Sequence, residues 1–214
     1  MLDRAIAGVA GAALLALAGP NAGAPADAVA AKPRVTFIGD SVAASLRYVP
    51  AAERMMRTGL DLRLDLRVCR RLAAPSCSFQ GSTPATALEA IRAGGSSLGR
   101  TVLIDVGYND SAASYRDDIP KVMGALKAAG VTSVVWTTLT EKTADYAALN
   151  DAIRAAATRS PKRVCVADWA AVSRGRAYFG GDGLHLNTAG ATALAKLLRP
   201  YALRGGRNGS CHPA

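Results

Sequence analysis

A serine follows a buried apolar segment at the point where the sequence changes character. The segment VTFIGDSVAASL, residues 35–46, begins with β-branched and aromatic residues typical of a strand and ends with alanine and leucine spaced as in a helix. Ser41 therefore lies at a turn from strand to helix, a place where nucleophiles are found. An alternative remains at this point, because aspartate and serine are ordinary N-caps and glycine is an ordinary turn residue.

A base and a carboxylate that could activate this serine occur together near the other end of the chain. A serine hydroxyl is a weak nucleophile until a base accepts its proton, and the base works best when a carboxylate fixes its tautomer. Asp182 and His185 are three positions apart, so the carboxylate can reach the imidazole within one tight turn. Taken singly, the Asp182-Gly183 pair is also an ordinary turn and His185 an ordinary structural histidine.

The charge that develops on a carbonyl oxygen during nucleophilic attack needs preorganised hydrogen-bond donors. The candidates are the backbone N–H groups of Ser41 and Gly81 and the side-chain amide of Asn109. Three aromatic residues near the same segments are candidates to line a small acyl pocket: Tyr108, Tyr178 and Phe179.

The elements that must position these residues alternate regularly between strands and helices. Apolar runs predict strands over residues 35–38, 60–68, 101–107, 131–139 and 163–169. Helical spacing predicts helices over residues 43–59 with a break at Pro50, 84–94, 115–130, 144–160 and 187–203. The interior strands lack polar alternation, whereas residues 60–68 alternate leucine with charged residues, as an edge strand does. The pattern predicts a central parallel sheet of about five strands in a three-layer α/β/α sandwich.

Polar residues interrupt this pattern where several strands end. They stand at residues 39–41, at Gly81 and at residues 107–110, while the cluster GGDGLHLN, residues 180–187, precedes the last helix. Ligands of such sheets bind outside the carboxyl ends of the strands. We therefore expect these four segments to converge at one edge of the sheet.

Four short motifs resemble the sequence blocks of the SGNH, or GDSL-type, hydrolase family, in the family's order. They are GDSV at 39–42, GST at 81–83, GYND at 107–110 and DGLH at 182–185. The combination is far more specific than any one block. A nucleotide-binding sheet is excluded because no G-x-G-x-x-G follows the first strand.

This resemblance implies a flavodoxin-like sandwich and an ester hydrolase that needs no cofactor and no metal. It implies Ser41 as the nucleophile, His185 as the base and Asp182 as the carboxylate that orients it. Gly81 and Asn109 are the implied oxyanion donors, together with the N–H group of Ser41.

The amino-terminal segment has the features of a secretory signal peptide. Arg4 precedes the uncharged small-apolar stretch AIAGVAGAALLALAG, and small-x-small cleavage motifs follow. The stretch is shorter than the roughly 20 residues that span a bilayer. We expect cleavage near Ala30, so that residues 1–30 are the signal peptide and residues 31–214 form one hydrolase domain, secreted or extracytoplasmic.

The chain is basic. It has 26 lysine and arginine residues against 16 acidic residues, a formal net charge of +10. Removing residues 1–30 takes away Arg4, Asp3 and Asp27, which leaves 25 against 14 and a net charge of +11. Such a charge favours polyanionic surroundings. The chain has few aromatic residues and no motif that reads nucleic acid, so we expect contact with an anionic cell envelope and not with nucleic acid. A solvated basic face is the simplest alternative.

Four cysteines in an exported protein predict disulfides. Four cysteines allow three connectivities, of which we expect Cys69 with Cys77 and Cys165 with Cys211. The second bridge would pin the carboxyl-terminal tail to the body of the protein. A zinc site is disfavoured, because no C-x-x-C occurs and the two histidines are not spaced with the cysteines as ligand pairs.

Three classes of function are compatible with these residues. The first is a monomeric, exported serine esterase that removes short acyl groups from a carbohydrate or lipid. The second is an acyltransferase, in which a sugar hydroxyl replaces water as the acceptor. A lipase or thioesterase would differ from the first in acyl-chain length, and no long apolar lid is evident. The third, a glycan-binding module without catalysis, is disfavoured because every catalytic residue type is present.

Overall fold

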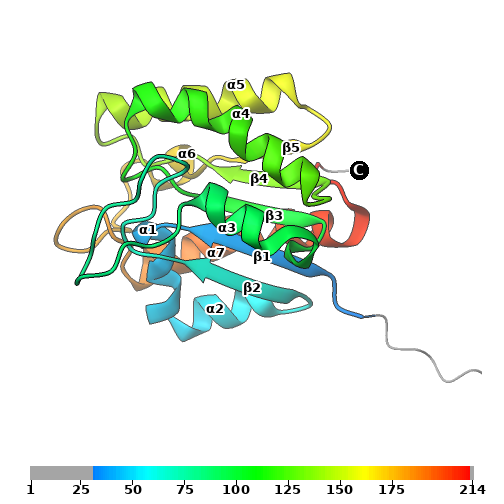
Figure 1. Ribbon diagram of the computed structural model, residues 1–214. Coiled ribbons are helices and arrows are strands. Elements are labelled where there is room, and N and C mark those ends of the chain that lie inside the picture. The colour runs from blue at the N-terminus through cyan, green and yellow to red at the C-terminus, as the bar shows by residue number, and fades with distance from the viewer. Residues whose placement is uncertain (1–30, 213–214) are drawn as a thin grey trace, which may run out of the picture. The chain divides into compact units, whose positions relative to one another are not determined.

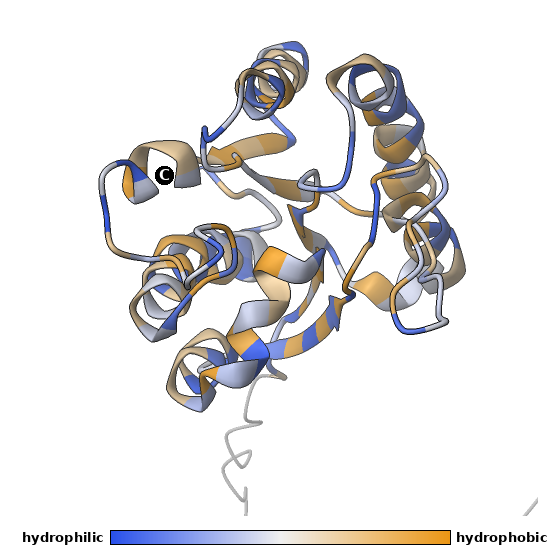
Figure 2. Ribbon diagram, turned by 90° about the vertical axis from the view of Figure 1, so that its left-hand side faces the viewer, coloured by the Kyte–Doolittle hydropathy of each residue, from blue (hydrophilic) through white to orange (hydrophobic). Residues whose placement is uncertain are grey.

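The computed structural model describes residues 31–212. The expected signal peptide lies outside the described residues. Five parallel strands form one sheet: β1 (Arg34–Gly39), β2 (Asp61–Leu66), β3 (Thr101–Asp105), β4 (Ser133–Thr137) and β5 (Val164–Ala167). The strand order is β2-β1-β3-β4-β5, so β2 is an edge strand as its alternating sequence predicts. Figure 2 shows this alternation as orange and blue bands along β2.

Helices cover both faces of the sheet, which confirms the predicted three-layer α/β/α sandwich. The seven α-helices of the described residues are α1 (Ser41–Ala44), α2 (Pro50–Arg57), α3 (Ala87–Gly94), α4 (Ala112–Ala128), α5 (Ala144–Arg159), α6 (Trp169–Ser173) and α7 (Thr188–Asn208). Helices α3, α4 and α5 pack side by side on one face, and α2 and α7 pack together on the other (Figure 1). The core strands β1, β3 and β4 are buried between these layers.

The last helix is longer than the sequence pattern predicts. The pattern ends it at residue 203, whereas α7 passes through Pro200 and continues to Asn208. The added part is held by packing, because Ala202 and Gly205 are buried. A Cβ atom at Gly205 would lie 2.8 Å from side-chain atoms of Thr101 on β3. Tertiary contact therefore outweighs the loss of one helical hydrogen bond at proline.

Two disulfides join the cysteines as predicted. Cys69 is bonded to Cys77, and Cys165 on β5 is bonded to Cys211 beyond the end of α7. No helix in the described residues is long and apolar enough to cross a membrane.

The turn that leaves β1 requires a glycine. A Cβ atom at Gly39 would lie 2.4 Å from Cβ of Ala43 and 2.7 Å from Cδ2 of Leu66, closer than side-chain atoms tolerate. Because Gly39 lacks that atom, the chain can turn directly from β1 into α1 against the end of β2. The next residues, Asp40 and Ser41, are thereby placed at the carboxyl edge of the sheet.

Candidate active site

Ser41 is the first residue of α1, and only Asp40 separates it from the carboxyl end of β1. Asp40 caps the helix, because its Oδ1 atom accepts a hydrogen bond from the N–H of Val42 at 3.0 Å. The capping interpretation and the nucleophile interpretation of this segment are therefore compatible. The aspartate holds the turn, and the serine hydroxyl is partly exposed beside it.

The structure brings Ser41, His185 and Asp182 into one hydrogen-bonded chain. Nε2 of His185 lies 3.0 Å from Oγ of Ser41, and Nδ1 of His185 lies 2.5 Å from Oδ2 of Asp182. The histidine therefore faces the serine with one ring nitrogen and the carboxylate with the other. This is the arrangement in which a carboxylate orients a base that can accept a serine proton.

A tight turn holds Asp182 and His185 in this geometry. Oδ1 of Asp182 accepts hydrogen bonds from the N–H groups of Leu184 (2.9 Å) and His185 (3.0 Å), so its other oxygen is left for the imidazole. Gly183 has φ of +66°, which favours glycine at this position. The turn is also joined to the segment that carries Ser41, because the N–H of Leu186 donates to Oγ of Ser45 at 3.1 Å.

The carboxylate of Asp182 is ionised at neutral pH. Its hydrogen bond with His185, followed by those from the N–H groups of Leu184 and His185, holds the pKa of Asp182 well below its usual range. All three contacts stabilise the charged form. A negative charge next to Nδ1 favours the tautomer in which Nδ1 carries the proton, and this leaves Nε2 free to accept the proton of Ser41.

Asp40 links the turn at Ser41 to the GYND segment. It is fully buried, and its Oδ2 atom accepts hydrogen bonds of 3.1 Å from the N–H groups of Gly107 and Tyr108. Burial raises the pKa of Asp40 to about 6, although the three backbone N–H bonds oppose this rise. Sequence reasoning identified only the capping role. The cross-link could not be found without knowing that β1 and β3 are neighbours.

Two further carboxyl groups lie near Asp40, of which Asp105 is buried and Asp110 is half-buried. Asp105 ends β3, its side chain has no hydrogen-bond partner within the described residues, and burial followed by the charge of Asp40 raises its pKa well above the ordinary range. Asp110 accepts a hydrogen bond from the N–H of Leu72 at 3.1 Å, and burial raises its pKa to about 7. The strand ends beneath the site are therefore poorly hydrated, which strengthens electrostatic interactions there.

Asn109 is packed against the disulfide-closed loop that follows β2. The side-chain amide of Asn109 donates to the backbone carbonyl oxygen of Arg70 at 3.1 Å. The backbone carbonyl oxygen of Asn109 accepts a hydrogen bond from Nε of Arg71 at 2.6 Å. The sulfur of Cys77, bonded to Cys69, lies 4.0 Å from Oδ1 of Asn109. The disulfide loop thus supports the residue that the motif resemblance implies as an oxyanion donor.

The remaining sequence candidates lie in different surroundings. Gly81 is exposed at the tip of a turn closed by the bridge between Phe79 and Ser82, and its oxyanion role stays a prediction. Tyr108 is 7% exposed, and its hydroxyl oxygen accepts a hydrogen bond from the N–H of Thr140.

The other two aromatic candidates lie in the segment before His185. The ring of Tyr178 stacks on Trp169, with centroids 5.8 Å apart. Phe179 is half-buried, forms a β-bridge with Leu186, and has Nζ of Lys142 at 5.3 Å from its ring centroid. Phe179 is thus the aromatic candidate that is joined most directly to the histidine's turn.

Within the described residues, one group of side chains has metal-ligand spacing, namely Cys165, Cys211 and His212. The two sulfur atoms are bonded to each other, so neither is available as a thiolate ligand.

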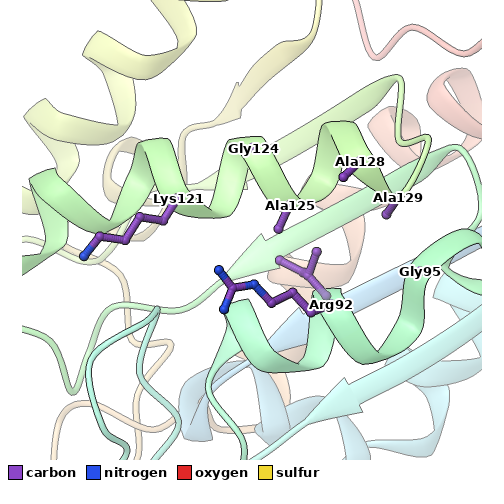
Figure 3. Close-up of a pocket in the computed structure, with 8 residues that line it drawn as sticks. Arg92, Gly95, Lys121, Gly124, Ala125, Ala128 and Ala129 are labelled. Carbon is purple, nitrogen blue, oxygen red and sulfur yellow. The ribbon is translucent and has the colours of Figure 1, made fainter.

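A cavity of about 470 Å³ lies between α3 and α4, with Arg92 and Lys121 on its rim and the small residues Gly124 and Ala125 along one side (Figure 3). None of the residues that line this cavity belongs to the group around Ser41.

Comparison with known proteins supports this architecture. No protein-family model matches the sequence, and no curated protein matches it significantly. Solved structures do match. One described as TesA has a TM-score of 0.58 at 17% identity, over 78% of this chain and 96% of that one. A carbohydrate acetylesterase family member from Sinorhizobium meliloti has a TM-score of 0.59 at 14% identity, over the same shares.

A third structure is the salicylyl-acyltransferase SsfX3 from a tetracycline biosynthetic pathway, with a TM-score of 0.54 at 18% identity. The match covers 80% of this chain and 55% of that one. The identities are low, so these similarities concern the fold. The chain therefore has the α/β fold of TesA, of this carbohydrate acetylesterase family member and of this acyltransferase, which is the fold that its four motifs imply.

Proposed function

We propose that the protein is a serine esterase that cleaves carboxylic esters through a Ser-His-Asp acyl-enzyme mechanism. One observation carries the proposal: Nε2 of His185 lies 3.0 Å from Oγ of Ser41 while Nδ1 of the same ring faces the carboxylate of Asp182. A nucleophile in contact with a base, and a base in contact with an orienting carboxylate, is the geometric signature of nucleophilic acyl transfer.

In the acylation step, Oγ of Ser41 attacks the carbonyl carbon of the ester while Nε2 of His185 takes the hydroxyl proton. The carbonyl oxygen becomes negatively charged in the tetrahedral intermediate. The N–H of Ser41, at the start of α1, and the amide of Asn109 are the donors proposed to stabilise this charge, with Gly81 as the third expected donor. The intermediate collapses when the ester C–O bond breaks and His185 gives its proton to the departing alkoxide.

In the deacylation step, water replaces the departed alcohol. Nε2 of His185 takes one proton from the water as its oxygen attacks the acyl carbonyl carbon. Collapse of the second tetrahedral intermediate returns the proton to Oγ of Ser41 and releases a carboxylic acid. Asp182 stays ionised throughout and stabilises the imidazolium that forms in both steps.

The proposed substrates are short acyl groups on a carbohydrate, and the proposed location is outside the cytoplasm. The two disulfides support the location, because such bonds persist in oxidising compartments. The basic charge of the chain supports contact with an anionic cell envelope. The fold shared with a carbohydrate acetylesterase supports the substrate class. We propose that the protein acts as a monomer, without nucleic acid.

A chain-length series of esters tests this proposal. We expect kcat/KM for acetyl and butyryl esters to exceed that for long-chain esters by at least about tenfold, which corresponds to roughly 1.4 kcal/mol in transition-state binding. The measurement is hydrolysis of matched nitrophenyl esters by the purified protein, followed by acetylated sugars. Rates that rise toward long chains would instead identify a lipase or thioesterase, with the same group of residues in a different pocket.

An acyltransferase is the second candidate, and the fold shared with a salicylyl-acyltransferase favours it. The same residues would form the acyl-enzyme, and a sugar hydroxyl would take the place of water in deacylation. Product analysis in the presence of added sugar distinguishes the two functions. Transfer to sugar that is faster than hydrolysis would replace the esterase assignment with the transferase.

Replacement of Asn109 by alanine is expected to lower kcat about a hundredfold, because one donor to the developing oxyanion is lost. The hydrogen bond to the carbonyl oxygen of Arg70 is lost as well, so we expect the free energy of unfolding to fall by about 1 kcal/mol. Ester hydrolysis and urea unfolding measure the two effects. If the folded fraction keeps its full specific activity, Asn109 is a turn residue and not an oxyanion donor.

A further inference from the structure

A groove runs along the edge strand β2 and ends beside the nucleophile's turn. It consists of two adjoining cavities of about 320 and 240 Å³, which share Arg67, Ser82 and Pro84. The first lies between β2 and α3. The second lies at the carboxyl end of β2 and includes Phe79 and Gln80. We call the two together the β2–α3 groove.

The charge of the β2–α3 groove is positive. Three arginines line it, Arg63, Arg67 and Arg70, against one carboxylate, that of Asp65. Arg70 is 2% exposed and is occupied within the fold, because it donates to the carbonyl oxygen of Asp65 at 2.6 Å, to Oδ1 of Asp65 at 3.1 Å and to the carbonyl oxygen of Ala85. This buried ion pair neutralises Asp65 and leaves the positive charge to Arg63 and Arg67.

These two arginines are available to a ligand. Arg63 forms no ion pair within the described residues and makes only a long contact of 3.5 Å with Oγ of Ser97. The side chain of Arg67 is 59% exposed and contacts Asp65 through Nε alone, at 3.2 Å. The outer nitrogens of a guanidinium form a planar fork that matches a carboxylate. The groove therefore offers two arginine side chains to negative groups along one line.

The groove is placed next to the site of ester cleavage by the pairing of β1 with β2. Gly39 is the register partner of Leu66, and the N–H of Arg67 donates to the carbonyl oxygen of Gly39 at 3.0 Å. Ser41 follows Gly39 by two positions. A polymer that lies in the groove can therefore extend from Arg63 past Arg67 to the nucleophile's turn.

An exposed aromatic ring stands at this end of the groove. Phe79 is 47% exposed, and two backbone hydrogen bonds with Ser82, of 2.9 and 3.0 Å, hold its segment in a closed turn. A rigid, exposed ring beside an arginine offers an apolar surface to one face of a sugar ring and a cation to its substituents. A phosphodiester chain could also bind the arginines, but its binding would not depend on the ring of Phe79.

We propose that the β2–α3 groove binds the backbone of a carboxylate-bearing glycan whose acyl ester is presented to Ser41. The inference rests on the proposed esterase and names its substrate class as an acylated acidic polysaccharide. Arg63 and Arg67 bind the carboxylates, and Phe79 packs against a sugar ring. The closing experiment measures binding of a polymer without acyl groups, so that its outcome is independent of catalysis.

The probe is unacetylated polygalacturonate, compared with the same polymer after its carboxylates have been converted to amides. The double variant Arg63→Gln/Arg67→Gln is expected to weaken binding of polygalacturonate at least about tenfold, since two charged hydrogen-bonding groups are removed. The matched control is Arg92→Gln/Lys121→Gln, which removes the same charge from the cavity on the other side of α3 (Figure 3) and should change the Kd less than about twofold.

Phe79→Ala separates glycan binding from simple attraction between charges. It is expected to weaken binding at least about threefold even in about 0.5 M sodium chloride, where exposed charges are screened. Equal effects of the groove variant and the control would overturn the proposal. So would a single-stranded DNA oligomer that binds as tightly as polygalacturonate, with no effect of Phe79→Ala. Normal groove-dependent binding by a protein that hydrolyses no ester would reject the esterase and leave the groove assignment in place.

Discussion

Replacing Ser41 with alanine is expected to lower ester turnover by about 10,000-fold or more, and to abolish covalent labelling by a fluorophosphonate. The substitution removes only the hydroxyl group. Its oxygen is the proposed nucleophile, so without it no acyl-enzyme can form. The fold should be unaffected, because Asp40 and not Ser41 caps α1 and Ser41 is partly exposed. Hydrolysis of nitrophenyl acetate, labelling followed by peptide mapping, and thermal unfolding provide the three measurements.

Ser160→Ala is the matched control for this prediction. Ser160 is partly exposed, as Ser41 is, and it lies at the carboxyl end of α5, outside the group around His185. The control variant should still be labelled by the fluorophosphonate, and the label should lie on Ser41. Labelling of Ser41→Ala at another residue, or turnover at the normal rate, would show that the nucleophile lies elsewhere.

The change of Asp182 to asparagine is expected to lower kcat by about 10,000-fold, although the two side chains have the same shape. The carboxylate accepts a hydrogen bond from Nδ1 of His185, and an amide that presents its NH2 group there favours the opposite tautomer. The proton then lies on Nε2 and points at Ser41, so the ring cannot accept the serine proton.

The pH dependence of the wild-type enzyme tests whether Asp182 is ionised during the reaction. The pKa of Asp182 is held well below its usual range, so the wild-type enzyme should lose no activity through protonation of Asp182 between about pH 5 and 8. Asp151→Asn, at a carboxylate whose side chain is 81% exposed, is the control and should leave kcat within about twofold. Full activity of Asp182→Asn would remove Asp182 from the mechanism.

The strands and the polar segments around Ser41, GYND and His185, which the structure brings together, could be predicted from the sequence because each depends on local composition. The buried strands β3 and β4 lack polar alternation, whereas the edge strand β2 alternates leucine with charged residues. Asp182 and His185 are close in the chain, so their contact follows from spacing alone. The contact of His185 with Ser41 was predicted from the resemblance of the four motifs, because the segment that carries His185 precedes α7 and does not end a strand.

Other features depend on contacts that no local pattern contains. α6 is five residues long and was not predicted as a separate helix, while the end of α7 depends on packing of Gly205 against the sheet. The role of Asp40 as a link to Gly107 and Tyr108 depends on the pairing of β1 with β3. The surroundings of Asn109 depend on the path of the disulfide loop, because a cysteine spacing predicts a bond but not where the closed loop packs.

The position of β1 between β2 and β3 has a consequence for how the protein acquires its activity. β1 pairs with β2 on one side and β3 on the other, Asp40 reaches a partner 67 positions away, and Ser41 meets a base 144 positions away. Contacts between parts of a chain so far apart in sequence add to the loop entropy that folding must overcome. The contact of His185 with Ser41 therefore needs more than a paired sheet: the turn before α7 must also lie against α1, where the N–H of Leu186 donates to Oγ of Ser45. We expect a state with the strands paired and this turn displaced to be inactive.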